Sequence, residues 1–114
     1  MRRPLVAGNW KMNGTRAGAG ALARAVAAGA EQASGCDIAL CPPFVHLAEV
    51  AATIAGTAVA LGAQDCSEHA AGAYTGEIAA PMLAEVGCRY VIVGHSERRS
   101  FHGEDDAQVA RKLM

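Results

Sequence analysis

The sequence predicts an α/β domain in which parallel strands alternate with helices. Short apolar runs, partly β-branched, recur at fairly regular distances, and continuous hydrophobicity of this kind is typical of strands buried on both faces. Segments with helical spacing separate the runs. The 114 residues, 52% of them apolar, suffice for one compact domain but not for two. The predicted strands are Leu5–Ala7, Ile38–Leu40, Val59–Gly62 and Tyr90–Val93.

The first two intervening segments predict helices with one apolar side each. Thr15 is a suitable cap for a helix that extends to about Gln32. A second helix starts at Pro43 and stops at Gly56. The side chains expected to pack are Leu22, Val26 and Ala30 in the first helix, and Leu47, Val50 and Ile54 in the second.

Two more helical patterns follow. Ile78, Met82 and Val86 form an apolar stripe that ends at Gly87, with Pro81 tolerated near its start. The last helix opens near residues 104–106, where acidic side chains suit a positive helix end, and continues to the last residue. The resulting four β-α units form either a small open sheet or part of a barrel. The longest irregular stretch, residues 64–77, suggests a functional loop or a contact.

Composition excludes several classes of protein. Ten basic residues against eleven acidic ones argue against a nucleic-acid binder. No apolar run is long enough to span a membrane, and the short run after Arg2 and Arg3 argues against a signal peptide. The four cysteines lack C-x-x-C spacing, so we expect reduced thiols in a cytoplasmic protein rather than a zinc site or disulfides.

Polar residues follow the first predicted strand. If the chain is still extended there, Asn9 and Lys11 point to the same side. An amide beside an ammonium suits an anionic, oxygen-rich ligand. The alternative interpretation is a solvated lysine next to a loop asparagine.

His95 follows the fourth predicted strand and opens a possible helical turn. Exposed amides at such a turn disfavour the imidazolium, and a neutral imidazole can polarise a carbonyl and transfer protons. The alternative is a histidine that only caps the loop. Arg98 stands where a G-x-S-x-G nucleophile motif requires glycine, which excludes that motif.

The other charged residues and histidines carry weaker signals. The run Glu97–Arg99 with Glu104–Asp106 is typical of a solvated, mutually paired surface. His46, His69 and His102 have no second histidine or cysteine three or four residues later, so we expect no metal site. Nucleotide-binding glycine motifs are also missing.

Four motifs, in order along nearly the whole chain, resemble triosephosphate isomerases. The opening Ala7-Gly8-Asn9-Trp10-Lys11-Met12-Asn13 resembles the family's first strand and loop. Cys41-Pro42-Pro43 resembles the end of its second strand. Gln64-Asp65 with residues 72–77 (GAYTGE) resembles its third loop, and residues 91–99 (VIVGHSERR) resemble its fourth strand and histidine turn.

The resemblance implies a TIM (β/α)8 barrel, of which residues 1–114 are a single partial domain, the first four βα units or half barrel. It also implies the cofactor-free interconversion of dihydroxyacetone phosphate and D-glyceraldehyde 3-phosphate through an enediolate, in glycolysis and gluconeogenesis. Such an enzyme is a cytoplasmic homodimer that binds a triose phosphate, with no metal, nucleic acid or membrane as a partner.

The same resemblance assigns roles to residues. His95 is the neutral catalytic electrophile, and Lys11 stabilises negative charge during catalysis. Asn9 binds substrate together with Lys11, and Glu97 supports Lys11. Thr75 contacts the partner subunit of the homodimer.

One essential group has no counterpart in the sequence. The family's general base is a glutamate after the sixth strand, which these residues do not include, so we expect the 114-residue chain alone to be inactive. We also expect its open sheet edges to self-associate or to pair with a complementary half. The alternative function is a non-catalytic half-barrel module whose role is assembly.

Overall fold

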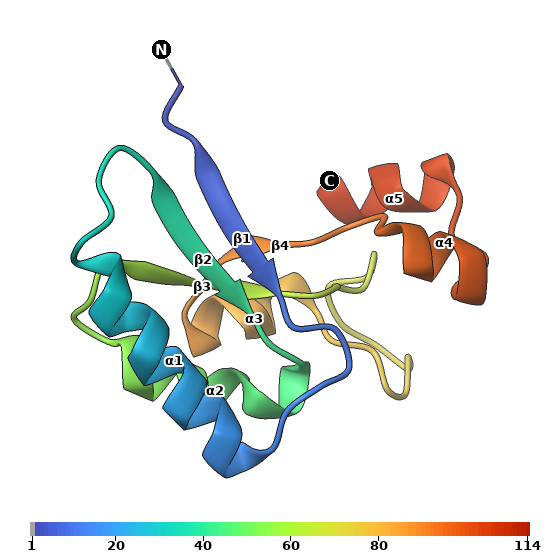
Figure 1. Cartoon of the computed structure of the whole chain (residues 1–114). Coiled ribbons are helices and arrows are strands. Elements are labelled where there is room, and N and C mark those ends of the chain that lie inside the picture. The colour runs from blue at the N-terminus through green and yellow to red at the C-terminus, as the bar shows by residue number, and fades with distance from the viewer. Residues whose placement is uncertain (1) are drawn as a thin grey trace.

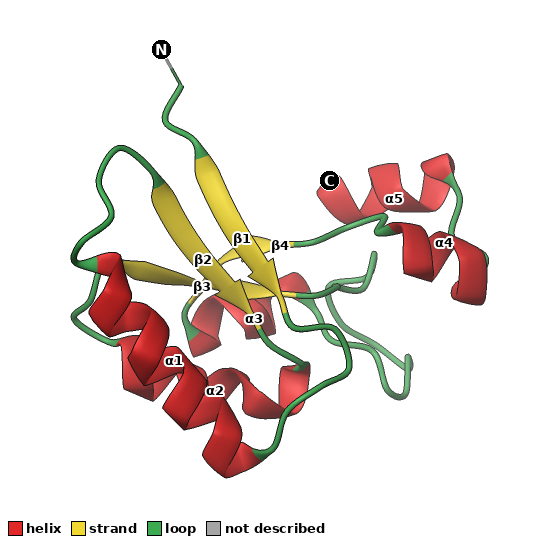
Figure 2. Ribbon diagram, viewed as in Figure 1, coloured by secondary structure: helices red, strands yellow, loops and turns green. Residues whose placement is uncertain are grey.

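A four-stranded parallel sheet organises the chain, in the spatial order β1-β2-β3-β4 (Figure 1). The computed structural model describes residues 2–114. The predicted alternation of strands and helices is confirmed. The strands are β1 (Leu5–Asn9), β2 (Asp37–Cys41), β3 (Val59–Ala63) and β4 (Cys88–Val91). The helices are α1 (Arg16–Ala30), α2 (Leu47–Ile54), α3 (Ala80–Val86), α4 (Ser96–His102) and α5 (Asp106–Leu113), with a 3-10 turn η1 (Phe44–His46) before α2 (Figure 2).

Helix α1 begins as predicted, but it packs through alanines. The Thr15 hydroxyl accepts the Gly18 N–H at 3.0 Å and caps the helix. Leu22, expected on the packed side, is 49% exposed, so that prediction is wrong. Because α1 lies close against α2, small side chains fit the contact where leucine does not. The buried positions are Ala19, Ala23, Ala27 and Ala30, with Gly20.

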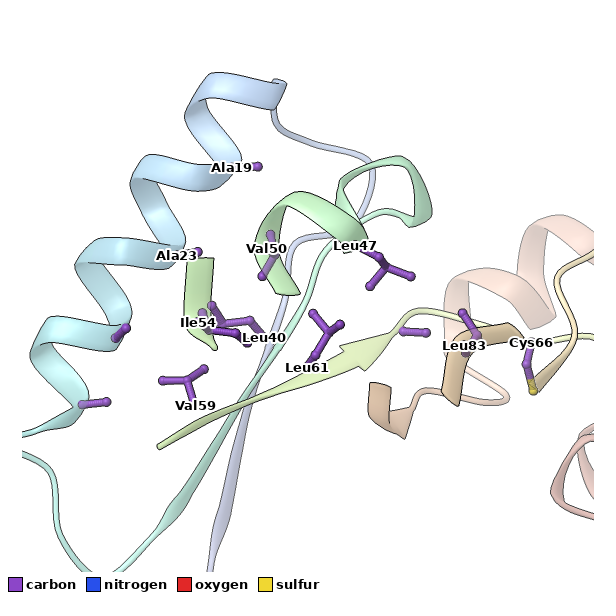
Figure 3. Close-up of a cluster of buried hydrophobic side chains, with 13 residues drawn as sticks. Ala19, Ala23, Leu40, Leu47, Val50, Ile54, Val59, Leu61, Cys66 and Leu83 are labelled. Atoms are coloured by element: carbon purple, nitrogen blue, oxygen red, sulfur yellow. The ribbon is translucent and has the colours of Figure 1, made fainter. Parts of the chain in front are cut away.

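Helix α2 supplies the large side chains of the core. Leu47, Val50 and Ile54 are all buried, as their spacing predicts. They pack with Leu40 of β2 and Leu61 of β3 between the helices and the sheet (Figure 3). Pro43 precedes η1 rather than α2, so the helix itself starts four residues later than predicted.

The third helix and fourth strand differ from their predicted positions. Helix α3 begins at Ala80, which places Pro81 in its first turn, and it buries Leu83 while Met82 is 54% exposed. Of the predicted stripe, Ile78 packs against the core just before the helix, while Met82 and Val86 face outward. Strand β4 begins two residues earlier than predicted, because its register places Cys88 opposite Leu61 ahead of an irregularity in β3.

The two outer strands are more exposed than predicted. We expected strands buried on both faces, but on β1 Leu5 is 45% and Val6 57% exposed, and on β4 Val91 is 38% exposed. That expectation holds for the inner strands, whose central residues are buried.

Two helices, rather than one, follow β4. Gly103, at φ +67°, ends α4, and the Asp105 side chain caps α5 by accepting the Gln108 N–H. The predicted last helix thus corresponds to α5, and the possible turn after His95 is α4. None of the helices in residues 2–114 is long and apolar enough to cross a membrane.

Candidate active site

The carboxyl ends of three strands meet around one pocket of about 370 Å³. Asn9 and Lys11 reach it from the end of β1, and Gln64 from the end of β3. His95 reaches it from the turn after β4, and Glu97 from the first turn of α4. The structure therefore brings the sequence-predicted amide, ammonium and imidazole together. Loops at this edge of a parallel sheet are where α/β proteins place their ligands.

Lys11 reaches the pocket in a different way from the one predicted. The chain is not extended there: Lys11 has φ +56°, and it is the one residue other than glycine with positive φ in residues 2–114. Asn9 Oδ1 accepts the Lys11 N–H at 2.9 Å, so the asparagine shapes the turn that carries the lysine. The Lys11 side chain then extends to Glu97, where Nζ and Oε2 are 2.9 Å apart.

Glu97 and Lys11 form a half-exposed ion pair. The hydrogen bond from Lys11 lowers the pKa of the Glu97 carboxyl, against a smaller opposing effect of desolvation, and the nearby charge of Lys11 adds to the lowering. Glu97 is therefore an anion at neutral pH and a fixed counter-charge for the ammonium. This geometry matches the supporting position that the resemblance implies for Glu97.

His95 both caps α4 and lines the pocket, so the capping interpretation is confirmed and the catalytic one stays a prediction. Its Nδ1 accepts the backbone N–H of Glu97 at 3.0 Å. An imidazole that accepts at Nδ1 carries its proton on Nε2. The neutral ring therefore has one N–H left to donate to a ligand oxygen.

A buried charge cluster lies next to the site and contradicts the prediction of a solvated surface. The Glu104 side chain is 1% and that of Lys112 3% exposed, with 2.7 Å between Oε2 and Nζ. Arg98 also donates to Glu104, and Asp65 accepts from Lys112 at 2.7 Å. The prediction is wrong for Glu104, although the exposed pair of Arg99 with Asp106 fits it. The pattern of the acidic run cannot reveal the difference, because Asp65 and Lys112 lie elsewhere in the sequence.

Thr75, His46 and His69 lie outside the pocket, whereas His102 lines it. Thr75 is exposed on the loop between β3 and α3. His69 stacks on Tyr74 in the same loop, with 3.8 Å between ring centroids. Within residues 2–114, no three histidine, cysteine or acidic side chains gather as metal ligands.

Comparison with known proteins decides the family. The family model for triosephosphate isomerase matches residues 4–114. The chain belongs to the triosephosphate isomerase family. It is 54% identical to the triosephosphate isomerase of Nitrosococcus oceani and 57% identical to that of Albidiferax ferrireducens, in each case over the whole chain and 46% of the relative.

A solved triosephosphate isomerase confirms the fold. The crystal structure of the enzyme from Bartonella henselae superposes with a TM-score of 0.92 at 42% identity, over 98% of this chain and 46% of that one. The predicted first four βα units of a TIM barrel are thereby confirmed. The chain spans less than half the length of the triosephosphate isomerases that it matches.

Sequence reasoning gave no role of its own to Gln64, although the residue is part of the quoted third-loop motif. In the structure its side-chain amide bonds two backbone carbonyls at the base of the pocket. The signal available in the sequence was its position, directly after a buried strand.

Proposed function

We propose that this chain contributes the amide, ammonium and imidazole of a triose-phosphate isomerase site. The reaction is the interconversion of dihydroxyacetone phosphate and D-glyceraldehyde 3-phosphate through an enediolate, as a step of glycolysis and gluconeogenesis. The observation that carries the proposal is the convergence of Asn9, Lys11 and His95 on one pocket in a chain of this family.

The chemistry of each group fits this reaction. The free Nε2–H of His95 donates to the substrate carbonyl oxygen, which stabilises the charge that develops there when the neighbouring carbon loses its proton. Because the ring is neutral, the same nitrogen can exchange protons between the two oxygens of the enediolate. Lys11 supplies a positive charge for the anionic substrate, and the Asn9 side chain holds the turn that carries Lys11.

The proton-abstracting base is proposed to lie outside these residues. The family resemblance assigns it to a glutamate after the sixth strand, and this chain matches 46% of its relatives' length. Glu97 does not take that role in the proposal, because its lowered pKa and its ion pair with Lys11 make it a weak base.

The test is isomerase turnover of the completed enzyme, in which these residues stand together with the segment that carries the proposed base, compared with its His95→Gln variant. Glutamine keeps a donor near the position of Nε2 but cannot pass protons, so we expect turnover to fall by about 10²–10⁴ with an unchanged circular dichroism spectrum. Isomerase carried over from the expression host would appear equally in both preparations. Unchanged turnover would refute the role of His95, and a complete lack of isomerase activity in the completed enzyme would refute the function.

We propose further that the protein is a homodimer in which Thr75 contacts the partner subunit. Its exposure on the long loop after β3 supports this, since a loop of that length without regular structure often serves in contacts. A monomer in sedimentation of the expressed protein would contradict it.

We infer a cytoplasmic location from the thiols. All four cysteines are free, and burial raises the pKa of the Cys41, Cys66 and Cys88 thiols, which keeps them protonated and unreactive. Fractionation of cells that express a tagged copy tests the location, and recovery outside the cytoplasm would contradict it.

A further inference from the structure

We propose that Gln64 is a positioning residue that holds Lys11 in place for the reaction. Gln64 is the first residue after β3. Its Nε2 lies 2.9 Å from the carbonyl oxygen of Lys11 and 2.9 Å from that of Cys41. A side-chain amide has two N–H donors, and both are used here. One amide group thus joins the ends of β1, β2 and β3.

Lys11 needs such support because its backbone is strained. A positive φ brings Cβ of an L-residue too close to its own backbone, and strain of this kind persists only where the surroundings enforce it. Asn9 Oδ1 holds the N–H of Lys11, and Gln64 holds its carbonyl. The two side chains therefore hydrogen-bond both backbone polar groups of the strained residue.

The backbone of Lys11 determines where its ammonium can reach. The side chain is half exposed and has several rotatable bonds, so surrounding packing does little to aim it. The left-handed backbone sets the direction of the Cα–Cβ bond, and in this direction Nζ reaches Glu97 beside the pocket. If Lys11 relaxed to a negative φ, the same side chain would leave from a different direction.

The neighbouring residue ties the same point of the chain to the histidine. Asp65 lies 3.2 Å from Arg98 and 2.7 Å from Lys112 (Oδ to side-chain nitrogen). Arg98 belongs to α4, the helix that starts directly after His95. Gln64 and Asp65 therefore fix the lysine loop and the histidine helix from adjacent positions, so that a displaced Gln64 changes the distance between the two functional groups.

The catalytic consequence rests on the proposed function, but the geometry can be measured without it. In the expressed protein labelled with ¹⁵N, both Gln64 side-chain amide protons should exchange with solvent at least about tenfold more slowly than those of Gln32, which is exposed beyond the end of α1. Lys11 should show the strong intraresidue HN–Hα Overhauser effect that marks a positive φ. Equal exchange of the two glutamines would overturn the inference.

Two substitutions test the consequence. Gln64→Glu keeps the size of the side chain but replaces both donors by acceptors that face two carbonyls, and Gln64→Met removes the donors without adding charge. We expect the Overhauser signature of Lys11 to disappear in each, and isomerase kcat/KM to fall about 10²-fold, the usual effect of displacing a reacting group by an ångström. Gln32→Glu makes the same charge change as Gln64→Glu and should alter neither quantity.

The outcomes separate this inference from the proposed function. A folded Gln64 variant that retains the Lys11 signature or full kcat/KM refutes the positioning role. If the completed, unsubstituted enzyme has no isomerase activity while the exchange and Overhauser results are as expected, the function fails and the positioning of Lys11 by Gln64 stands. If both variants unfold, the exchange rates in the unsubstituted protein decide.

Discussion

Two groups next to His95 Nδ1 favour opposite protonation states. The Glu97 N–H, 3.0 Å away, requires an unprotonated acceptor, whereas the Glu97 carboxylate, with Oε1 at 3.6 Å, favours a proton on the ring. The N–H is the stronger constraint, because it is within hydrogen-bond distance and can only donate, whereas Oε1 at 3.6 Å is too far away for a hydrogen bond. The neutral Nε2–H tautomer follows.

Nitrogen chemical shifts of the ring test this tautomer. At about pH 8, where a free histidine is neutral, we expect His95 to show a protonated Nε2 and an unprotonated Nδ1. The long-range ¹⁵N–¹H spectrum should therefore differ from that of an averaged, solvent-exposed ring. A protonated Nδ1 would contradict the hydrogen bond to Glu97 N–H and remove the donor that the proposed mechanism assigns to Nε2.

Lys11 shows why residue-level geometry was only partly predictable. Alternation along an extended chain placed Asn9 and Lys11 on one side, and the structure does bring them to one pocket. The means is a left-handed turn, however, and nothing in the lysine itself favours a positive φ. Asn9 bonds the Lys11 N–H locally, but the bond to its carbonyl comes from Gln64, 53 positions away, so the local sequence carries only part of the signal for this conformation.

At the scale of elements, two glycines should respond in opposite ways to the same substitution. A Cβ at Gly62 in β3 would lie 2.6 Å from Cys41 Sγ, a buried atom on the neighbouring strand. A Cβ at Gly29 in α1 would meet nothing within 4 Å. We expect Gly62→Ala to lower the free energy of unfolding by about 1–3 kcal/mol through overpacking. Gly29→Ala should raise it by about 0.5–1 kcal/mol through helix propensity.

Urea unfolding of both variants beside the unsubstituted protein measures this pair. Each variant adds one methyl group, so differences in side-chain size cannot explain opposite signs. A Gly62→Ala protein as stable as the Gly29→Ala protein would show that β2 and β3 can separate at Cys41 without cost, contrary to their close register.

The elements that were predicted well are those with strong local patterns. Leu47, Val50 and Ile54 recur with helical spacing, and all three are buried in α2. Helix α1 was located, and Val26 and Ala30 pack as predicted, but Leu22 does not. The other buried alanines were missed, because alanine gives little hydrophobic contrast. The boundaries of β4 depend on its register with β3, a tertiary feature.

At the scale of the whole molecule, the buried pair of Glu104 and Lys112 joins α4 and α5 to Asp65, which lies far from both helices in sequence. Burial by itself raises the pKa of Glu104, but hydrogen bonds from Lys112 and Arg98 outweigh it, so that pKa is lowered. Burial likewise lowers the pKa of Lys112, but the hydrogen bonds to Asp65 and Glu104 outweigh it, and that pKa is raised. Both groups are therefore charged in the folded protein.

Lys112→Met should cost about 3 kcal/mol of unfolding free energy, since removing one partner leaves a buried charge uncompensated. The control Arg3→Met breaks an exposed pair with Asp37 and should cost less than about 1 kcal/mol.

The pH dependence of this cost follows from the two pKa shifts. A carboxyl whose folded pKa is lowered stabilises the protein above its unfolded pKa, and this stability is lost as the pH falls through the folded pKa. A lysine whose folded pKa is raised stabilises the protein below its unfolded pKa, and this stability is lost as the pH rises through the folded pKa. The cost of Lys112→Met should thus be constant from about pH 5 to 10 and shrink in more acidic urea titrations. Equal costs for the two variants would contradict a buried network.

The last prediction concerns residues 1–114 expressed as a separate polypeptide. In the described residues, β1 and β4 are the outer strands of the sheet, so each has one row of backbone N–H and C=O groups without a strand partner. Leu5 and Val6 on β1 are about half exposed. Open apolar edges of this kind pair with other chains. We expect this polypeptide to associate, with itself or with a complementary half barrel, and to lack isomerase turnover until the proposed base is supplied.

Sedimentation velocity over a range of concentrations measures the association. Val6→Lys puts a charge on the β1 edge and should shift the polypeptide toward monomer, whereas Leu22→Lys places the same charge on the exposed side of α1 and should not. Mixing with the complementary half then separates the two candidate functions. Recovered turnover supports an isomerase site completed by both halves, while a stable assembly without turnover supports the assembly module. A monomer at every concentration, before any substitution, would show that the sheet edges are protected by some other means.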